Sequence, residues 1–366
     1  MLAAPARAFY YGRFPTPTMP PTREVHAAAI LERVIEAALP YEFRTFVLGF
    51  ERPDGYERTS HEDLFRALKI ELGQGVEKRF PGARVDFLTP ELEVRIGRGL
   101  EVSVRSAPIF IAGRYRKLSR EIPASRWVHH ECGGRGCPSC GLTGTLCGPS
   151  VEELIEAPVL ELSRGQTAFF HALGREDTDA RMLGRGRPFV LEVHRPLRRT
   201  LPLEQIRERF HACAGGAAEI RDLAPAERSM VPIVKEAAAD KSYRAWIETR
   251  SPIPSNAAEI AAALQGAVVE QLSPTRVADR RGPETRRRRR IIQSSWLGET
   301  GSGVAWEIRV EAGMYVKELV SGDGGRTAPS LQSALGMECA CASLDVLEVH
   351  WSFPWEPADR EEKALS

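Results

Sequence analysis

The chain has 366 residues, of which 43% are hydrophobic and 27% charged, and its formal net charge is +1 at pH 7. At roughly 150 residues per domain, this length favours two or three domains, each with its own core. The near-neutral charge excludes a uniformly basic protein, so any basic surface must be local. No run of about 18 apolar residues occurs, and residues 1–22, rich in Pro, Thr and Ala, contain no signal-peptide core. We therefore expect a cytoplasmic globular protein, with no membrane partner and with no fixed structure over residues 1–22.

The first predicted elements alternate between helical and extended patterns. Apolar residues at helical spacing predict helices over 26–39 and 60–80, and a run of β-branched and aromatic residues predicts a strand over 43–50. Short strands are expected over 85–87, 92–96, 101–105 and 109–113. Helices and strands in this mixture predict a first α+β module over residues 23–125.

A linker rich in Gly, Cys, His and Pro follows over residues 126–150, and we interpret it as a compact metal knuckle. Cys137 and Cys140 have the CxxC spacing that lets two thiolates of one turn bind one ion, with Gly141 supplying backbone freedom. A second pair, HxxC, stands just before them. The predicted ligands, three sulfurs and one imidazole suited to a tetrahedral Zn²⁺, are His129, Cys132, Cys137 and Cys140.

Two alternatives stay open for this linker. His130 or Cys147 could replace His129 as the fourth ligand, or the loop could simply carry incidental free thiols. The chain has seven cysteines, an odd number, and four lie within residues 132–147. That grouping suits metal binding in a reducing compartment better than a disulfide framework. With four protein ligands the ion would be structural, because its binding energy becomes folding energy.

Strands and helices alternate again over residues 151–355, which predicts a second α+β domain, and residues 356–366 are expected to form a solvated tail. A basic segment lies inside this domain. Eight arginines stand between Arg276 and Arg290 against two acidic residues. Five are consecutive and repel one another unless phosphates neutralise them, which favours a nucleic-acid partner over a solvated face or a nuclear signal. If the segment is extended, only alternate side chains can meet one RNA backbone.

A second unusual stretch is GREDTDARMLGRGRPF, residues 174–189, where two aspartates and a glutamate lie among four arginines. A carboxylate beside arginines stays ionised, because nearby opposite charge lowers its pKa. An anion on an RNA-binding surface opposes phosphate attraction, so it needs a reason, and nucleophilic attack on a sugar carbon is one. The alternative is a surface ion pair. Within the stretch, Asp179 is the nearest rival to Asp177.

These residues carry a resemblance. Residues 174–177, GRED, resemble the G/H-R-x-D signature of pseudouridine synthases, and FHALGREDTDARMLGRGRPFVLEV is similar to one branch, the tRNA pseudouridine synthase family usually called Pus-ten. Further blocks that match this family in order are KSYRAWIE (241–248), QLSPTRVADRR (271–281) and AGMYVKELVSGDGGRTAPSL (312–331). Upstream, FIAGRYRKLSREIPASRW (110–127) resembles the closing segment of the family's amino-terminal, THUMP-containing module. A single RxD motif is weak evidence for a family, whereas several blocks in the order and spacing of one family are specific evidence for it.

The resemblance implies an α+β protein with a THUMP-containing RNA-binding module over residues 23–125 and a pseudouridine synthase domain over 151–355. That domain would have a mixed, largely antiparallel sheet. It implies an isomerase that converts uridine 55, with uridine 54 as a second candidate, in the T arm of tRNA to pseudouridine. No cofactor or nucleotide is expected for catalysis, Zn²⁺ would be structural, and we expect a monomer. The alternatives are a pseudouridine synthase acting on another RNA and a zinc-stabilised, non-catalytic tRNA-binding protein.

The same resemblance implies roles for single residues. Asp177 would be the catalytic aspartate, either attacking C1′ or assisting loss of the 2′ proton. Arg175 would enter the space left by the flipped uridine or orient the loop. Tyr243 would lie on the uracil ring, Lys317 would pair with Asp177, and Tyr315 would support the pocket wall.

Two expectations concern neighbouring side chains. If residues 315–319 form a regular strand, Lys317 and Leu319 share a face and Val316 points away, so we expect Leu319 rather than Val316 in the pocket. The arginines expected to contact RNA are Arg181, Arg187, Arg276, Arg280, Arg281, Arg288 and Arg290.

Overall fold

A computed structural model describes residues 23–51, 62–145, 148–277, 285–300 and 303–356. By its internal contacts the chain divides into two compact units, Met1–Ser106 and Ala107–Ser366. The expected unstructured segment over 1–22 lies outside the described residues. None of the described helices is long and apolar enough to span a bilayer.

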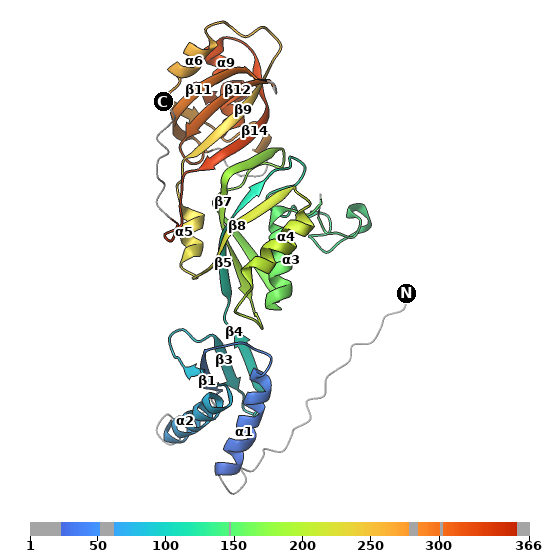
Figure 1. Ribbon diagram of the computed structural model, residues 1–366, viewed down its shortest axis with the longest axis vertical. Coiled ribbons are helices and arrows are strands. Elements are labelled where there is room, and N and C mark those ends of the chain that lie inside the picture. The colour runs from blue at the N-terminus through green and yellow to red at the C-terminus, as the bar shows by residue number, and fades with distance from the viewer. Residues whose placement is uncertain (1–22, 52–61, 146–147, 278–284, 301–302, 357–366) are drawn as a thin grey trace, which may run out of the picture. The chain divides into compact units, whose positions relative to one another are not determined.

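The smaller unit places two helices against a four-stranded sheet (Figure 1). Its elements are α1 (Arg23–Ala38), β1 (Thr45–Phe50), α2 (Glu62–Arg79), β2 (Arg84–Val85), β3 (Leu92–Ile96) and β4 (Val102–Ser106). The strand order is β2-β1-β3-β4, with β1 parallel to both neighbours and β3 antiparallel to β4. Val34, Phe46 and Leu92 are fully buried between helices and sheet. These elements confirm the predicted ones to within a few residues, although residues 60 and 61 of the expected second helix lie outside the described ranges.

The larger unit is built on one ten-stranded sheet. Its strands are β5 (Ile109–Lys117), β6 (Thr167–Ala172), β7 (Ala180–His194), β8 (Ala218–Ala226), β9 (Lys241–Thr249), β10 (Val268–Gln271), β11 (Arg287–Thr300), β12 (Gly303–Val310), β13 (Thr327–Ala328) and β14 (Cys339–Val349). Its α-helices are α3 (Val151–Ser163), α4 (Leu203–Ala214), α5 (Met230–Glu236), α6 (Ala257–Ala263), α8 (Val316–Ser321) and α9 (Leu331–Leu335). Short 3₁₀ turns are η1 (Pro138–Cys140), η2 (Thr275–Val277) and η3 (Gly322–Gly325).

The strand order is β13-β10-β11-β12-β9-β14-β7-β5-β8, with β6 paired to β7 off this path. The β14–β7 pair is parallel, and the other pairs within the described ranges of this sheet are antiparallel. The predicted mixed, largely antiparallel sheet is thereby confirmed. The parallel pair marks the middle of the sheet, where β7 begins at Ala180, next to the carboxylate-rich stretch.

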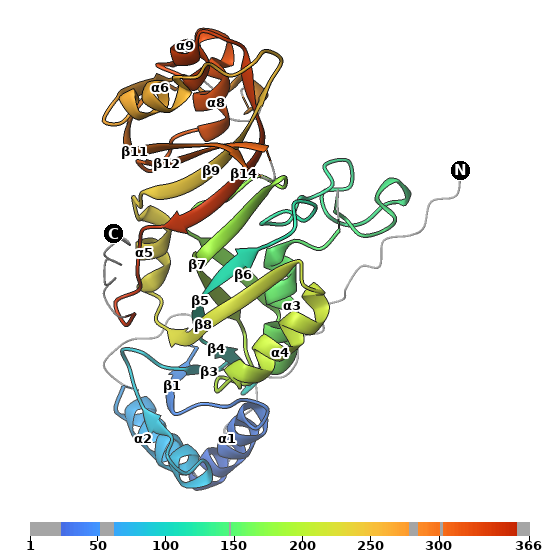
Figure 2. The same cartoon turned by 45° about the horizontal axis from the view of Figure 1, so that its top comes forward.

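Two hydrophobic cores lie along this sheet. One joins β5, β7 and β8 to α3, α4 and α5, and the other joins β9, β11 and β12 to α6, α8 and α9. Figure 2 shows α6, α8 and α9 gathered at one end of the sheet, and α3 and α4 beside β8. Tyr243 of β9 packs against both cores. The site described below therefore forms where the two cores meet.

The position of β5 differs from the expected domain boundary near residue 125. We expected residues 109–113 to close the first module, but β5 lies between β7 and β8 in the larger sheet and the boundary falls at Ser106. The physical reason is that Ile111, Ala112 and Tyr115 are all buried, although neighbouring residues of a strand point to opposite faces. A strand with this pattern is covered on both faces of its sheet. Such a strand needs partners on both edges, which the larger sheet supplies.

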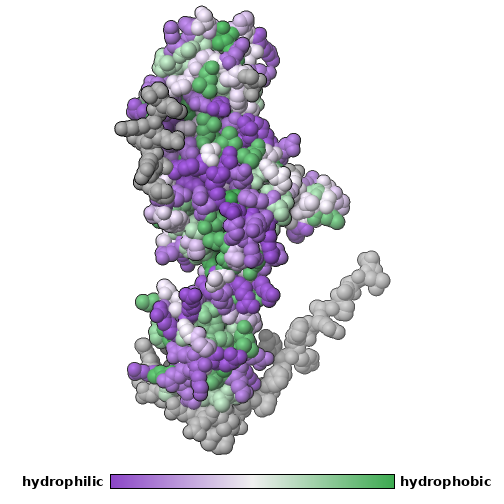
Figure 3. Space-filling model, viewed as in Figure 1, coloured by the Kyte–Doolittle hydropathy of each residue, from purple (hydrophilic) through white to green (hydrophobic). Residues whose placement is uncertain are grey.

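The expected solvated tail over 356–366 also needs correcting at its first residue. Glu356 accepts hydrogen bonds from Nε and Nη2 of Arg114, both at 2.7 Å, and Arg114 is 1% exposed. A buried guanidinium requires a carboxylate partner, and Glu356 is that partner. Residues 357–366 lie outside the described ranges. On the face shown in Figure 3, hydrophilic side chains cover much of the larger unit, and apolar residues form separate patches.

Candidate active site and metal centre

Residues 174–179 of the carboxylate-rich stretch lie in the loop between β6 and β7, and residues 174–177 line an open pocket of about 300 Å³. Gly174 opens this loop with φ of +74°, and a Cβ there would stand 3.3 Å from Nη1 of Arg187. A side chain at this position would therefore be both strained and crowded. The lining residues are Gly174, Arg175, Glu176, Asp177, Ala180, Arg187, Lys241, Tyr243, Arg276, Arg287, Gly313, Met314, Tyr315, Val316, Lys317, Leu344 and Val346.

Asp177 meets two cations at this pocket. Nη1 of Arg276 lies 3.0 Å and Nζ of Lys317 lies 3.3 Å from its Oδ2 atom. Lys317 also binds both carboxylate oxygens of Asp179, at 2.8 and 2.7 Å. Burial alone would lower the pKa of Lys317, but the bonds to Asp179 and the charge of Asp177 raise it overall. The predicted Lys317–Asp177 pair is present, and Lys317 is shared with Asp179.

Arg276 was expected to contact phosphate, but its guanidinium already bridges two carboxylates. Nε lies 2.7 Å from Oε1 of Glu318, a carboxylate that is 5% exposed, while Nη1 points to Asp177. Burial opposes the charge of Arg276, yet Glu318, Asp177 and Asp179 together raise its pKa. Glu318 was missed by sequence reasoning, although its position beside Lys317 in the same block was a usable signal.

The pocket wall includes Tyr243 from the middle of the sheet, where it lies opposite Ile308 of β12 and Val346 of β14. Burial raises the pKa of Tyr243 to about 12, and the nearby carboxylates act in the same direction. The phenol therefore stays neutral at physiological pH. Burial likewise lowers the pKa of Lys241, another lining residue, to about 8.

The expected strand over 315–319 is wrong, because Val316–Ser321 is the helix α8. Tyr315 precedes its first turn, and Gly322 ends it with φ of +76°. With 3.6 residues per turn, Val316, Leu319 and Val320 share one face of α8 and are all buried in the second core, and Val316 at the start of the helix also lines the pocket. The pocket is therefore lined by Val316 and not by Leu319, which is the reverse of what we expected from strand alternation.

Tyr315 lies in the pocket wall as expected and is held from two sides. The buried Gln271 amide accepts from the Tyr315 backbone N–H at 2.8 Å and donates to its carbonyl at 2.9 Å. The guanidinium of Arg287 stacks 4.9 Å from the Tyr315 ring centroid. Arg175, also a lining residue, donates from Nη1 to Oγ of Ser125 at 3.0 Å.

One expected RNA contact is excluded by burial. Arg187 is 2% exposed and pairs with Glu176, whose carboxylate lies 2.8 Å from Nε. Its Nη1 donates to the Leu173 carbonyl at 2.7 Å, and Glu176 also accepts from the Tyr115 hydroxyl at 3.1 Å. A phosphate cannot reach this guanidinium, so Arg187 is part of the base of the pocket.

Of the arginines in the basic run, some are exposed and others are partly buried, as expected for alternate side chains of a strand. Arg286, Arg288 and Arg290 are exposed, whereas Arg287 and Arg289 are partly buried, and Nε of Arg289 donates to the Ala312 carbonyl at 2.6 Å. The expected alternation along this basic run is confirmed. Outside the basic run, Arg181 forms a bidentate ion pair with Asp345, with distances of 2.7 and 2.8 Å. The expected contacts Arg280 and Arg281 lie outside the described residues.

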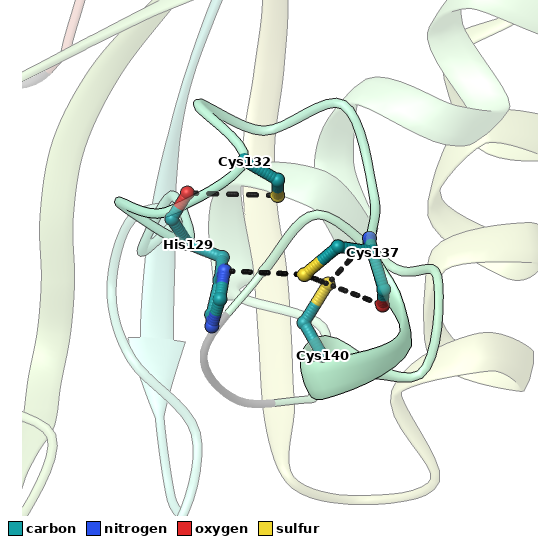
Figure 4. Close-up of side chains that lie close together, drawn as sticks. All are labelled: His129, Cys132, Cys137 and Cys140. Carbon is teal, nitrogen blue, oxygen red and sulfur yellow. Dashed lines mark hydrogen bonds between the residues drawn. The ribbon is translucent and has the colours of Figure 1, made fainter.

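The knuckle brings its four predicted ligands together (Figure 4). The ligand atoms of His129, Cys132, Cys137 and Cys140 all lie within 4.8 Å of one another. Cys137 Sγ is 3.7 Å from both His129 Nδ1 and Cys140 Sγ. Sulfur ligands about 2.3 Å from a tetrahedral ion lie about 3.8 Å apart, so this cluster could hold a metal ion.

Backbone donors support the thiolate form that a metal requires. The N–H groups of Cys137 and Gly144 donate to Cys140 Sγ at 3.2 and 3.3 Å, and these bonds lower the pKa of Cys140 to about 6. Gly141 has φ of +62°, as the tight CxxC turn requires. Of the two alternative ligands, His130 is exposed and outside the cluster, and Cys147 lies outside the described residues.

Comparisons with known proteins identify the family to which the chain belongs. The family model described as Pus10, C-terminal, matches residues 110–350. The chain is 41% identical over 287 residues to the tRNA pseudouridine synthase Pus10 of Methanothrix thermoacetophila, covering 77% of this chain and 63% of that protein. It is 39% identical over 344 residues to the protein of the same name from Methanothermobacter marburgensis, covering 87% and 84%.

Among solved structures, a chain of a Cbf5-Nop10-Gar1 complex is similar with a TM-score of 0.35 and 18% identity, over 55% of this chain and 46% of that chain. That likeness is too weak to carry an argument. The family model covers more than half of the chain, and the Methanothermobacter protein is matched over most of its length. The chain therefore belongs to the Pus10 family of tRNA pseudouridine synthases.

Proposed function

We propose that the chain isomerises uridine 55 in the T arm of tRNA to pseudouridine, that uridine 54 is its second target, and that Asp177 is the catalytic residue. The observation that carries this proposal is the carboxylate of Asp177 at the pocket, held at Oδ2 by Lys317 and Arg276. The two cations hold the carboxylate at the pocket, where its other oxygen can bond to an electrophilic sugar carbon. Membership in the family supports the same chemistry.

The chemistry needs only the groups of this pocket. In one route, a carboxylate oxygen of Asp177 bonds to C1′ while the N1–C1′ bond breaks and its electron pair leaves with the uracil. In the other, the carboxylate takes the 2′ proton as the N1–C1′ bond breaks, which leaves a double bond between C1′ and C2′. The uracil then rotates, and C5 bonds to C1′ while the bond from Asp177 to C1′ breaks on the first route, or while the proton returns to C2′ on the second. C5 finally loses its proton and N1 gains one, so atoms and electrons balance without a redox partner. Because Oδ2 is occupied by cations, we assign Oδ1 to the substrate.

The remaining pocket residues receive roles that fit their contacts. The neutral ring of Tyr243 offers a flat apolar face for the detached uracil, which must rotate without strong hydrogen bonds. The exposed Arg175 occupies or orients the space beside the extruded nucleotide. Val316 forms part of the apolar wall, and Tyr315 with Arg287 supports it.

We assign two further parts of the chain to RNA binding and stability. The exposed arginines Arg286, Arg288 and Arg290 of the basic run would contact phosphates. The smaller unit would be the THUMP-like module that grips the tRNA. The cluster of His129, Cys132, Cys137 and Cys140 would hold a structural Zn²⁺, because three sulfurs and one imidazole are its preferred donors.

The proposal is tested by release of tritium from C5-labelled uridine in tRNA transcripts. We expect release by the wild type and a loss on the order of 10³-fold or more in Asp177→Ala, since the group makes and breaks bonds. Asp179→Ala is the matched control: it removes a carboxylate from the same loop and the same lysine, and it should retain most of the rate.

Transcripts with cytidine at position 55, at position 54 or at both identify the target. Absence of release by the wild type from every transcript would remove the proposed activity. Release by Asp177→Ala at the wild-type rate, or a greater loss in Asp179→Ala, would move the catalytic role away from Asp177. Release from the doubly substituted transcript would point to another uridine, or to another RNA as the natural substrate.

A further inference from the structure

A lysine that the chemistry above does not use lies behind the catalytic loop. Lys117, the last residue of β5, is 0% exposed. Its Nζ donates to the carbonyl oxygens of Thr178 at 2.7 Å and of Ser119 at 2.9 Å. Burying an ammonium group is unfavourable, and an apolar side chain of similar volume would fill the same space without that cost. A buried lysine at this position beside the loop is therefore expected to have a function.

The two bonds are directed at the loop residue that separates Asp177 from Asp179. Thr178 has a buried Oγ1 that finds no hydrogen-bond partner among the described residues, so its side chain does not anchor the loop there. The next carbonyl, that of Asp179, accepts from Nη1 of Arg120 at 2.9 Å. Arg120 is itself held at 2.6 Å by Asp345, which is fully buried.

The loop is thus held at its backbone by one segment and at its carboxylates by another. Lys117 at the end of β5 and Arg120 just after it bind the carbonyls of Thr178 and Asp179. Lys317 of α8 binds the side chains of Asp177 and Asp179. With the bond from Lys117 released, Lys317 could still bind either carboxylate, and the position of Asp177 would depend only on the weaker set of contacts that remain, from Arg276, Arg120 and the Glu176–Arg187 pair.

We propose that Lys117 is a positioning residue of the isomerase: through the Thr178 carbonyl, its buried ammonium holds the loop so that Asp177 reaches the sugar. The inference rests on the proposed function and adds a residue to it. Lys117 touches no substrate, so it acts through the loop. A displacement of the carboxylate by about 1 Å is enough to lower the rate on the order of 10²-fold.

The test uses the full chain and Lys117→Met, which keeps length and volume but removes the donors. We expect the single-turnover rate of tritium release at saturating tRNA to fall on the order of 10²-fold. The dissociation constant for tRNA should change by less than about twofold, because the Lys117 side chain is not exposed to bound RNA and its donors are bonded to backbone carbonyls. A rate within about threefold of wild type would overturn the proposal.

Arg114→Met is the matched control. Arg114 lies on the same strand, is equally buried, and binds Glu356 and the carbonyls of Gly186 and Trp351 instead of the catalytic loop. Its loss should lower the melting temperature but leave the rate of the folded protein unchanged. An equal loss of rate in both variants would mean that Lys117 acts only through stability, and would also overturn the proposal.

A pH profile of the wild type tests the same idea without a substitution. The charged groups facing Lys117 are Glu176, Asp177 and Asp179 of the loop and Arg120, and Glu176 in turn binds Arg187 and Tyr115. Burial lowers the pKa of Lys117 to about 8 despite these carboxylates. Above that pH the charge is lost and the bonds to the carbonyls weaken, so the rate should decline.

The sign of the stability change separates this decline from unfolding. The pKa of Lys117 is lower in the folded chain than its usual 10.5, so the unfolded chain binds more protons. The contribution of this group to the free energy of unfolding therefore rises with pH between about 8 and 10.5, while the rate falls. A rate that stays constant to pH 9.5 would overturn the proposal.

Lys241 has a similarly lowered pKa, so Lys241→Met completes the series. The decline above pH 8 should persist in that variant, whatever its absolute rate. Disappearance of the decline would assign the titration to Lys241 and overturn the role of the Lys117 charge. A wild type inactive at every pH would instead count against the proposed function, so the two failures are distinguishable.

Discussion

A buried ion pair between Glu176 and Arg187 forms the base of the pocket. Glu176 and Arg187 are 1% and 2% exposed at their side chains and lie 2.8 Å apart. Charges buried in this way are tolerated only together, because each compensates the desolvation of the other. The pair joins the loop to β7, so it stiffens the base of the site while Asp177, one residue on from Glu176, stays at the surface.

Removing one partner should therefore be costly. We expect Glu176→Ala to lower the free energy of unfolding by about 3 to 5 kcal/mol, since Arg187 would be left buried without its counter-charge. Urea denaturation of the purified protein measures the change. As a control, Glu204→Ala removes an exposed partner of Arg207 and should cost less than about 1 kcal/mol. Equal, small losses in both variants would contradict a buried pair of this kind.

Strand geometry divides the basic run on β11 between two tasks. Arg288 and Arg290 are exposed, and Nε of Arg288 lies 3.4 Å from the exposed Glu270. Arg287 and Arg289 point the other way, toward Tyr315 and the Ala312 carbonyl. Consecutive arginines are therefore not interchangeable: one set is available to phosphate and the other supports the pocket wall.

This division predicts different salt dependence. In a filter-binding titration against salt, the double variant Arg288→Ala with Arg290→Ala should lose about 1.5 to 2 from the slope of log binding constant against log salt concentration. Arg289→Ala should leave that slope unchanged, because its guanidinium is bonded inside the protein. The idea would be rejected by an unchanged slope in the double variant.

The knuckle is an element without a hydrophobic core of its own. Its only deeply buried ligands are His129 and Cys132 among the described residues of the cluster, and its turns are held by backbone bonds to sulfur. Metal binding would therefore supply the energy that packing does not.

Metal analysis of purified protein checks this expectation. We expect about one Zn²⁺ per chain in the wild type, a loss of bound metal in Cys140→Ser, and faster proteolytic cleavage within residues 126–150 of that variant. Cys213→Ser is the control, because Cys213 is an exposed free cysteine outside the cluster and should retain the ion. Undiminished zinc in Cys140→Ser would remove this residue from the ligand set.

Across the chain, the boundary of the larger unit is set by a strand that precedes the knuckle. β5 is paired along both edges, to β7 and β8, and Lys117 at its end contacts the loop that carries Asp177. The sheet and the site therefore depend on residues that come before the expected boundary near 125.

Two fragments test this boundary. A fragment of residues 107–366 should unfold cooperatively on heating, because it contains every strand of the large sheet. A fragment of residues 126–366 should show no cooperative transition, because removing β5 leaves β7 and β8 without their shared partner and opens the first core. Circular dichroism distinguishes them, and equal melting temperatures would contradict the assignment of β5.

Sequence periodicity predicted the elements of the smaller unit and the alternation of the basic run, because each of these depends on residues close together in the chain. The mixed, largely antiparallel sheet was implied by the family resemblance. Spacing also identified the four candidate metal ligands, which lie within one short loop. The ordered blocks indicated the family, and they named Arg175, Asp177, Tyr243, Tyr315 and Lys317, which the fold brings to one pocket.

Other features of the site depend on contacts between distant parts of the chain. Residues 316–321 form a helix with one face buried in the second core, and its first residue, Val316, borders the pocket while Leu319 is enclosed by the core. Nothing in its local sequence distinguishes Arg187 from an exposed arginine. It is buried because it lies in β7 and pairs with Glu176. Likewise Lys117 meets Thr178 across 61 residues of sequence. The sequence by itself determined which chemistry the chain carries, whereas only the order of strands decided which charges are buried, because burial is a property of the assembled sheet.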